Sequence, residues 1–419
     1  MKIVQLSSGY KISYNGGITN YVRALSNELV AKGHEVYVID SFKGDGGAEN
    51  TDFLFSLISL NSNILRPFHL NSVIYNDDVI KLRKIFEDIK PDIIHIHMMI
   101  DLPADVIETA KEFSKVIISL HDYSYICKRI TMIDSEGLLC KTSSFGENCN
   151  SCISALETNR YTKYITDKLG SGSKLRTVFP SKNNESHYQF MRKALSTVDM
   201  LIAVSSRVKE IYINEGFNNK KFIVNHIGNI TAENPRNISY VKKELITICF
   251  IGNFSKYKGA ELVLELASKL DPKKFKIELY GLIDNYYLEL IRDYSNLTYN
   301  GKYKQEQLAN ILLNIDLGLV LPIWEDNAPQ VVFELLNNGI PVIGTRMGGI
   351  PDFIQHGVNG LLIDRDKSNF PALISLMNSA EFENILISLT NMVKSTKKVS
   401  QHNSEIINLY LETLSEDCL

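Results

Sequence analysis

The chain has 419 residues, 44% of them hydrophobic and 22% charged, which is typical of a globular protein of two or three domains. Its formal net charge of -3 argues against a protein that binds nucleic acid over its whole surface, because such proteins are usually strongly basic. The first residues do not form a signal peptide, and no apolar run approaches the roughly 18 residues that span a bilayer. We therefore expect a cytoplasmic protein, either free or peripheral to the inner face of the plasma membrane.

Strands and helices alternate through the first half of the chain. A buried strand at residues 3–6 precedes a glycine-containing loop and a helix whose apolar residues repeat at i, i+4 and i+8, with Gly33 as its C-cap. The predicted elements that follow are strand 36–39, helix 79–89, strand 93–96, helix 104–113, strand 116–120 and strand 201–204. Such βαβ units build a parallel sheet.

A polar segment at residues 231–243 predicts a linker, and the same alternation then restarts. Its predicted elements are strand 246–251, helix 261–270, strand 276–280, helix 307–315, strand 317–321, helix 331–338, strand 341–344 and a last helix at 404–414. The sequence thus predicts an α/β protein with two doubly wound Rossmann-like domains, at residues 1–230 and 244–395. We expect the C-terminal helix, 400–419, to join the first domain, and the active site to lie in the cleft between the domains.

The most specific motifs lie in the second half of the chain. Asp326 and Glu334 are eight positions apart, and a carboxylate is a strong acceptor for the vicinal hydroxyls of a ribose or hexose. The paired glycines Gly348 and Gly349 let backbone N–H groups approach an anion. Lys258 lies in a strand-to-helix loop, a setting that suits a phosphate group.

In order and spacing these motifs resemble those of family-4 glycosyltransferases with the GT-B fold. The shared pattern is a carboxylate-x7-Glu motif, followed by the runs 339–343 (Gly-Ile-Pro-Val-Ile) and 348–352 (Gly-Gly-Ile-Pro-Asp). The resemblance implies that Glu334 holds the donor ribose, that Asp326 lies near the transferred sugar and that Lys258 neutralises the diphosphate. The backbone of Gly348 and Gly349 would line the same pocket.

Two positions depart from the family pattern. The first carboxylate is usually glutamate and is Asp326 here. The residue after Gly252 is usually an arginine that clamps the diphosphate, and it is Asn253 here. The missing positive charge is then supplied by another residue, such as Arg207 or Arg346, or not at all.

In the first half of the chain we single out Gly16, Gly17 and His121. The glycine pair precedes the first helix and either lets the backbone approach a ligand or forms a plain turn. His121 ends a predicted strand, where it can donate to a sugar hydroxyl or stabilise a developing charge. His95 and His97 share a strand face, and we expect structural roles for them because no third metal ligand is evident.

Four cysteines, Cys127, Cys140, Cys149 and Cys152, form an insertion after His121. The final C-x2-C is a chelating pair, and four thiolates suit a structural zinc site, with free or partly paired thiols as the alternative. No cofactor is expected for catalysis.

Residues 160–193 carry eight basic and two acidic side chains, interleaved with apolar ones. This stretch predicts either a face that docks on an anionic membrane or an ordinary solvated face.

By resemblance, the expected activity is a retaining hexosyltransferase. It would move a sugar from a UDP- or GDP-sugar to a glycan or lipid-linked acceptor in surface polysaccharide or glycolipid synthesis. No residue is an obvious nucleophile, so same-face attack is favoured over double displacement. The alternatives are a GT-B epimerase without an acceptor and a zinc-bearing nucleic-acid module. A nicotinamide oxidoreductase is disfavoured because no G-x-G-x-x-G opens a βαβ unit.

Overall fold

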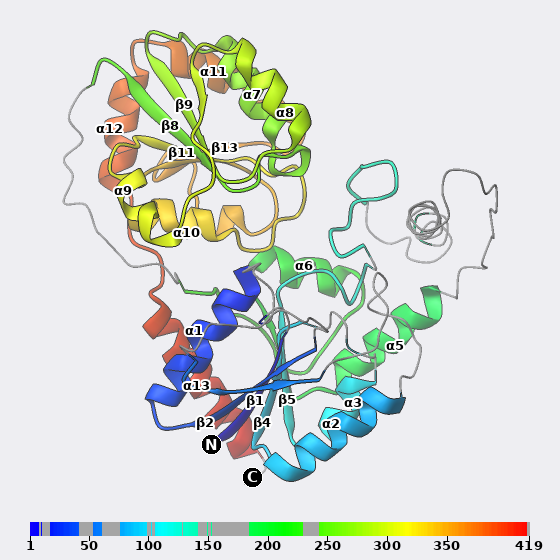
Figure 1. Ribbon diagram of the computed structural model, residues 1–419. Coiled ribbons are helices and arrows are strands. Elements are labelled where there is room, and N and C mark those ends of the chain that lie inside the picture. The colour runs from blue at the N-terminus through cyan, green and yellow to red at the C-terminus, as the bar shows by residue number, and fades with distance from the viewer. Residues whose placement is uncertain are drawn as a thin grey trace, which may run out of the picture. The chain divides into compact units, whose positions relative to one another are not determined.

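The computed structural model describes residues 1–7, 10, 17–41, 53–60, 76–98, 102, 105–127, 129–140, 149, 152, 184–228 and 243–416. Internal contacts divide the chain into two compact units (Figure 1). Unit 1 comprises the described residues of 1–204, 208–225 and 403–419, and unit 2 comprises those of 205–207 and 226–402. Each unit is described by itself.

The described strands of unit 1 form a seven-stranded sheet in the order β3-β2-β1-β4-β5-β6-β7, in which every neighbouring pair is parallel. The strands are β1 (Lys2–Ser7), β2 (Glu35–Asp40), β3 (Ser56–Ser59), β4 (Ile93–Ile96), β5 (Lys115–Leu120), β6 (Met200–Ala203) and β7 (Phe222–Val224). The inner strands β4 and β6 are buried along their whole length, as expected for parallel strands covered on both faces. The strand order reverses direction between β1 and β4, and ligands of such sheets bind outside the carboxyl ends of the strands at this point.

Helices cover both faces of the unit 1 sheet. They are α1 (Gly17–Ala31), α2 (Asn76–Ile89), α3 (Val106–Lys111), α5 (Asn184–Thr197), α6 (Ser206–Asn214) and the C-terminal α13 (Val399–Ser415). Figure 1 shows α1 and α13 to one side of this sheet and α2 and α3 to the other.

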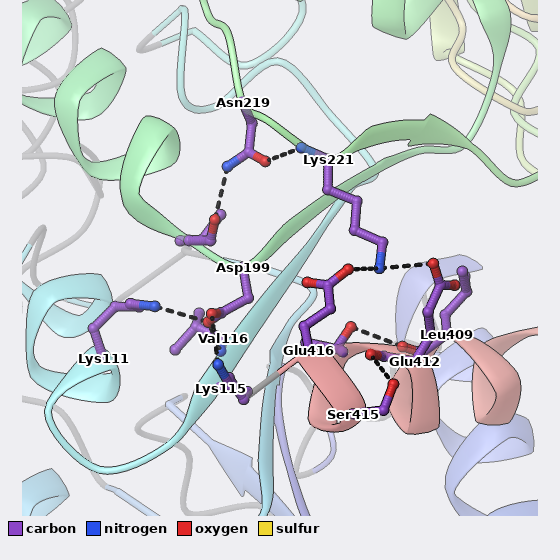
Figure 2. Close-up of polar contacts among 12 residues, drawn as sticks. Lys111, Lys115, Val116, Asp199, Asn219, Lys221, Leu409, Glu412, Ser415 and Glu416 are labelled. Atoms are coloured by element: carbon purple, nitrogen blue, oxygen red, sulfur yellow. Dashed lines mark hydrogen bonds and ion pairs between the residues drawn. The ribbon is translucent and has the colours of Figure 1, made fainter. Parts of the chain in front are cut away.

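The C-terminal helix α13 is anchored in unit 1 by one buried ring and a pair of ion pairs. Tyr410 is fully buried. Lys221, which precedes β7, lies 2.9 Å from Glu412 and 2.8 Å from Glu416 (Figure 2). The helix that ends the chain is therefore part of the first unit's core.

Unit 2 contains a six-stranded parallel sheet in the order β10-β9-β8-β11-β12-β13. Its strands are β8 (Ile246–Ile251), β9 (Phe275–Tyr280), β10 (Leu297–Tyr299), β11 (Leu317–Val320), β12 (Val342–Thr345) and β13 (Gly360–Ile363). Its helices are α7 (Ala260–Lys269), α8 (Asn285–Leu290), α9 (Leu308–Leu312), α10 (Gln330–Asn337), α11 (Phe370–Asn378) and α12 (Phe382–Met392), with short 3-10 helices that include η1 (Lys256–Lys258). The direction of the strand order reverses between β8 and β11, so the loops after these two strands meet at the expected ligand-binding edge.

The structure confirms the predicted α/β class and the two parallel sheets. The four edge strands of the described sheets, β3, β7, β10 and β13, were not predicted, and neither were the helices α6, α8, α11 and α12. Gly33 adopts φ 84°, and its N–H donates to Val30 O just beyond α1, as predicted for a C-cap. None of the helices in the described parts of the chain is both long and apolar enough to cross a membrane.

Candidate active site

Lys258 and Asp326 form an ion pair at the reversal point of the unit 2 sheet. Lys258 ends η1 after β8, Asp326 follows β11, and Lys258 Nζ lies 2.6 Å from Asp326 Oδ2. The same ammonium lies 5.5 Å from the centre of the Trp324 ring, an arrangement that favours a cation. The lysine side chain is 40% exposed and the aspartate 11%, so the charge of Lys258 remains within reach of a bound anion.

The two loops that carry this pair are packed directly on each other. Ile323 N–H donates to Tyr257 O at 3.0 Å. Gly259 has φ +89°, and a Cβ there would meet Leu321 O at 1.9 Å. Only glycine fits this close backbone approach, so the local sequence determines where Lys258 stands relative to Asp326.

Glu325 is 2% exposed and binds two arginines. Arg365 donates to both of its carboxylate oxygens, at 2.7 and 2.9 Å, and Arg207 donates to Oε1 at 2.8 and 3.2 Å. Burial alone would raise the pKa of the Glu325 carboxyl, but the hydrogen bonds from Arg365 and then Arg207 lower it below its ordinary value. Glu325 is therefore an anion that holds two guanidinium groups beside Asp326.

The glycine pair Gly348–Gly349 packs against the same loop. Gly348 N–H donates to Glu325 Oε2 at 2.9 Å, and Gly349 N–H donates to Asp326 O at 2.8 Å. A Cβ on Gly348 would meet Asp326 O at 1.8 Å, and one on Gly349 would meet Asn327 O at 2.1 Å. The Gly348 amide thus binds a carboxylate and the Gly349 amide binds the backbone of the 325–327 loop, and both positions need glycine because that loop lies against them. That the pair also lines the donor pocket stays a prediction.

Glu334 lies on α10 and is 7% exposed. Burial, together with the neighbouring Glu334 carboxylate, raises the pKa of the Tyr303 hydroxyl, so a phenol lies close to this carboxylate. Gln330 stands one helical turn earlier on the same face. Its Oε1 and Nε2 are buried and have no hydrogen-bond partner among the described residues. Buried amides are usually satisfied, so Gln330 is suited to a ligand that reaches Glu334.

The other residues predicted for the donor site are placed as follows. Asn253 is exposed in the loop after β8. Arg207 is the second residue of α6, is grouped with unit 2 and donates to Glu325. Arg346 Nε donates to Asp364 at 2.7 Å, outside the Glu325 cluster.

In unit 1, His121 directly follows β5 and is half-buried. Its Nε2 lies 3.2 Å from His97 Nδ1, and its ring lies 5.1 Å from that of Tyr21 in α1. Gly17 begins α1 and is exposed, whereas Gly16 lies outside the described residues. The structural roles expected for His95 and His97 agree with their contacts, because both rings are engaged by hydrogen bonds inside the unit.

The family models match nearly the whole chain. Glycosyltransferase Family 4 matches residues 15–228, and glycosyl transferases group 1 matches residues 232–398. The first match alone spans just over half of the chain. The chain belongs to glycosyltransferase family 4. This confirms the family resemblance found in the sequence.

Curated relatives and solved structures agree with this membership. An uncharacterized glycosyltransferase of Methanocaldococcus jannaschii is 24% identical over 262 residues, 61% of this chain and 70% of that protein. An N-acetyl-alpha-D-glucosaminyl L-malate synthase of Bacillus anthracis is 30% identical over 186 residues, 40% of this chain and 45% of that protein.

Several solved structures are similar to this protein over almost the whole length of both compared chains. A sucrose-phosphate synthase from Thermosynechococcus elongatus has a TM-score of 0.67 at 15% identity, with 99% of each chain covered. HepE of Anabaena in complex with UDP has a TM-score of 0.63 at 12% identity, with 98% of this chain and 100% of that chain covered. At these identities the likeness shows the fold, which is GT-B.

Sequence reasoning about this family member missed Glu325, Arg365, Gln330 and Tyr303. Glu325 directly precedes Asp326, and this acidic dipeptide was a sequence signal that could have identified it. Arg365 lies 40 residues beyond its partner, and nothing local to it indicates the contact.

The cysteines of the insertion lie near one another. Burial, and then the neighbouring thiols, raise the pKa of Cys140 to about 12. Cys127 is buried, and the backbone N–H groups of Arg129 and Met132 donate to its sulfur. Within the described residues, however, no three His, Cys, Asp or Glu side chains are arranged to hold a metal ion. Zinc stays a prediction, and metal analysis of the purified protein tests it.

Proposed function

We propose that this member of glycosyltransferase family 4 transfers a sugar from a nucleotide-diphosphate sugar to an acceptor hydroxyl with retention of configuration. The observation that carries the proposal is the ion pair between Lys258 and Asp326 at the reversal point of the unit 2 sheet. A donor diphosphate would take the place of Asp326 as a partner of Lys258. Asp326 would then be released beside the sugar.

The nucleoside end of the donor fits the neighbouring helix. Glu334 is a buried acceptor for the ribose hydroxyls, and the unpartnered amide of Gln330 lies one turn away. HepE of Anabaena is described in complex with UDP, which supports a uridine donor. One relative, from Corynebacterium glutamicum, is a GDP-mannose-dependent alpha-mannosyltransferase that is 33% identical over 119 residues, 27% of each chain. We therefore propose a UDP- or GDP-sugar.

Arg207 and Arg365 supply the positive charge that Asn253 lacks. Glu325 neutralises one of the two guanidinium charges, so the cluster keeps a net charge of about +1 beside the diphosphate site. The side chains of Arg207 and Arg365 are 25% and 41% exposed, which leaves their guanidinium groups partly accessible to an anion. This cluster compensates for the departure at position 253.

The reaction breaks the bond between the anomeric carbon and the diphosphate oxygen and forms a bond from that carbon to the acceptor oxygen. In same-face attack the acceptor proton passes to the departing diphosphate, so the products are the glycoside and the nucleoside diphosphate. Lys258 stabilises the negative charge that develops on the leaving group. His121, in unit 1, is proposed to contact the sugar.

Product analysis tests the proposal. The purified protein is incubated with UDP- and GDP-sugars and a panel of glycan and lipid-linked acceptors, and the products are examined by mass spectrometry and NMR. We expect a new glycosidic bond whose anomeric configuration matches that of the donor. A changed nucleotide-sugar without an acceptor product would indicate an epimerase, and an inverted glycoside would contradict retention.

The acceptor class and the membrane stay proposals. Residues 160–183 of the basic stretch lie outside the described residues, so the contribution of this stretch is argued from its sequence alone. A lipid-linked acceptor is consistent with a protein that visits an anionic membrane surface.

A further inference from the structure

A buried chain of side-chain hydrogen bonds runs through unit 1 from His121 to the C-terminal helix α13. His121 Nε2 lies 3.2 Å from His97 Nδ1, and His97 Nε2 lies 2.6 Å from Gln5 Oε1. Gln5 Nε2 donates to the Tyr410 hydroxyl oxygen at 3.2 Å, and that hydroxyl lies 2.6 Å from His95 Nδ1. His97 is 2% exposed, and Gln5, His95 and Tyr410 are fully buried. These hydrogen bonds therefore lie inside the unit, where the loss of a partner is costly.

Gln5 determines the direction of this chain because its amide has one donating end and one accepting end. Its Nε2 donates to Tyr410, so its Oε1 accepts and His97 Nε2 must carry the hydrogen. Neutral His97 then holds its lone pair on Nδ1, where it accepts from His121 Nε2–H. Neutral His121 consequently carries its own lone pair on Nδ1.

The hydrogen bonds at the Tyr410 end of this network run in the same direction. The Tyr410 hydroxyl already accepts from Gln5, so its single hydrogen is available to His95 Nδ1. His95 Nε2–H then donates to Ser119 Oγ at 2.8 Å. With this assignment every bond from His121 to Ser119 runs the same way.

We infer that His97 is a positioning residue that makes neutral His121 a hydrogen-bond acceptor at Nδ1. The group that Nδ1 would recognise is a hydroxyl, of the transferred sugar or of the acceptor, and this part of the inference rests on the proposed function. From the sequence alone, His121 was expected to donate to a sugar hydroxyl or to stabilise a developing charge. When His121 gains a proton, the new hydrogen sits on Nδ1 and the bond to His97 is kept.

Tyr21 restricts the rotation of both rings. Its ring centre lies 5.7 Å from that of His97 and 5.1 Å from that of His121, and the residue is 2% exposed. Because Tyr21 belongs to α1, the orientation of His121 is set by α1, β1, β4 and α13 together.

Two substitutions of His97 separate positioning from packing. In His97→Asn the amide replaces the Nδ1 edge of the ring, so its oxygen can accept from His121 but the bond to Gln5 is lost. In His97→Gln the amide reaches the Nε2 position, so the bond to Gln5 survives and His121 loses its partner. We expect kcat to stay within about threefold for His97→Asn and to fall at least about tenfold for His97→Gln, a loss typical of one misplaced catalytic contact. The donor KM should change less than twofold in both.

Ser119→Ala is the matched control, because it removes the hydrogen bond between His95 and Ser119 and leaves the bond between His97 and His121 in place. It should leave kcat unchanged, and thermal unfolding of all three variants shows whether any simply fails to fold. A second readout does not depend on activity. By 15N NMR, the His121 ring should carry its hydrogen on Nε2 alone in the unmodified protein and on either nitrogen in His97→Gln.

Equal losses of kcat in His97→Asn and His97→Gln would overturn the inference, as would a His121 ring whose hydrogen position is the same in His97→Gln as in the unmodified protein. A different outcome would concern the proposed function instead. If His121→Ala transfers sugar at the full rate, His121 does not contact the substrate, and the NMR comparison still decides whether His97 sets its hydrogen position.

Discussion

Glu325 lies between two guanidinium groups and a backbone amide, with its side chain 2% exposed. Its hydrogen bonds to Arg365, Arg207 and Gly348 N–H use both carboxylate oxygens. A buried carboxylate with these partners is stable only as an anion, since protonation would remove the attraction that offsets its burial. Within unit 2, the side chain thereby joins Arg207, Arg365 and the glycine loop after β12.

Glu325→Gln should destabilise the protein while preserving the shape of the side chain. The neutral amide leaves Arg207 and Arg365 without their shared anion. Both arginines are partly exposed, so water offsets part of the loss and we expect a cost of about 1–2 kcal/mol, below that of a fully buried pair. Glu265→Gln is the control, because it breaks the exposed pair with Lys269 and should cost less than about 0.5 kcal/mol. Equal melting temperatures for the two variants would contradict this role.

The pH dependence of this difference follows from the lowered pKa of Glu325. A carboxyl whose folded pKa is lowered stabilises the protein above its unfolded pKa, about 4.3 for glutamate, and that stabilisation is lost as the pH falls through the folded pKa. The gap in unfolding free energy between the unmodified protein and Glu325→Gln should therefore be full at neutral pH and shrink below about pH 4. Thermal unfolding measured across that range checks it, and a gap that widens in acid would be inconsistent with an ionised Glu325.

At the scale of residues, the sequence indicated the members of the donor site that belong to a spaced motif. Lys258 and Asp326 were expected together, and they form an ion pair. Their roles toward a donor stay predictions. The partners of Glu325 could not be predicted, because Arg207 and Arg365 lie 118 and 40 residues away from it. Such contacts depend on which strands become neighbours in the sheet, and the residues around each partner do not indicate this.

Among the elements, the loops after β11 and β12 behave as one packed structure. Gly348 has φ +52°, and Asp326 O lies where a Cβ on this residue would clash with it. Its amide donates to the Glu325 carboxylate, so this loop holds the side chain that binds the two arginines. A role of these amides toward the donor stays a prediction. The sequence predicted the importance of the glycines, but the reason for it depends on a neighbouring loop.

Gly348→Ala should displace the loop that carries Asp326. The added Cβ would lie 1.8 Å from Asp326 O, backbone that cannot move away cheaply. Gly357→Ala is the matched control, because Gly357 also has a positive φ, +79°, but a Cβ there meets nothing within 4 Å. The control should lose about 1–2 kcal/mol from backbone strain alone, and Gly348→Ala should lose more and also weaken nucleotide binding. Thermal unfolding and calorimetric titration measure both effects. Equal behaviour of the two variants would show that the close approach is unimportant.

Element types were predicted best for long amphipathic helices and for strands buried inside a sheet. Helix 79–89 and strands 93–96 and 246–251 were found with the same ends or nearly so, as α2, β4 and β8. Helix 307–315 proved shorter, because its first turn is the 3-10 helix η3 (Gln305–Gln307) and α9 ends at Leu312. Short strands at the sheet edges were missed because each is recognisable only by the strand it pairs with.

At the scale of the whole chain, the two units share the same sheet architecture. Each sheet reverses its strand order once, between β1 and β4 in unit 1 and between β8 and β11 in unit 2. The residues singled out for function follow strands at or beside these points, with His97 and His121 after β4 and β5, and Lys258 and Asp326 after β8 and β11. The alternation of strands and helices made this architecture predictable, since right-handed crossovers leave few other arrangements.

The central claim is that unit 2 holds a nucleotide-sugar between Lys258 and Glu334, and calorimetric titration of UDP- and GDP-sugars tests it most directly. The unmodified protein should bind one of these donors at a 1:1 ratio. Lys258→Ala and Glu334→Ala should each weaken binding at least about tenfold, or about 1.4 kcal/mol, while Lys269→Ala, on the exposed side of α7, should bind normally. Donor affinity that is unchanged in both Lys258→Ala and Glu334→Ala would contradict the account.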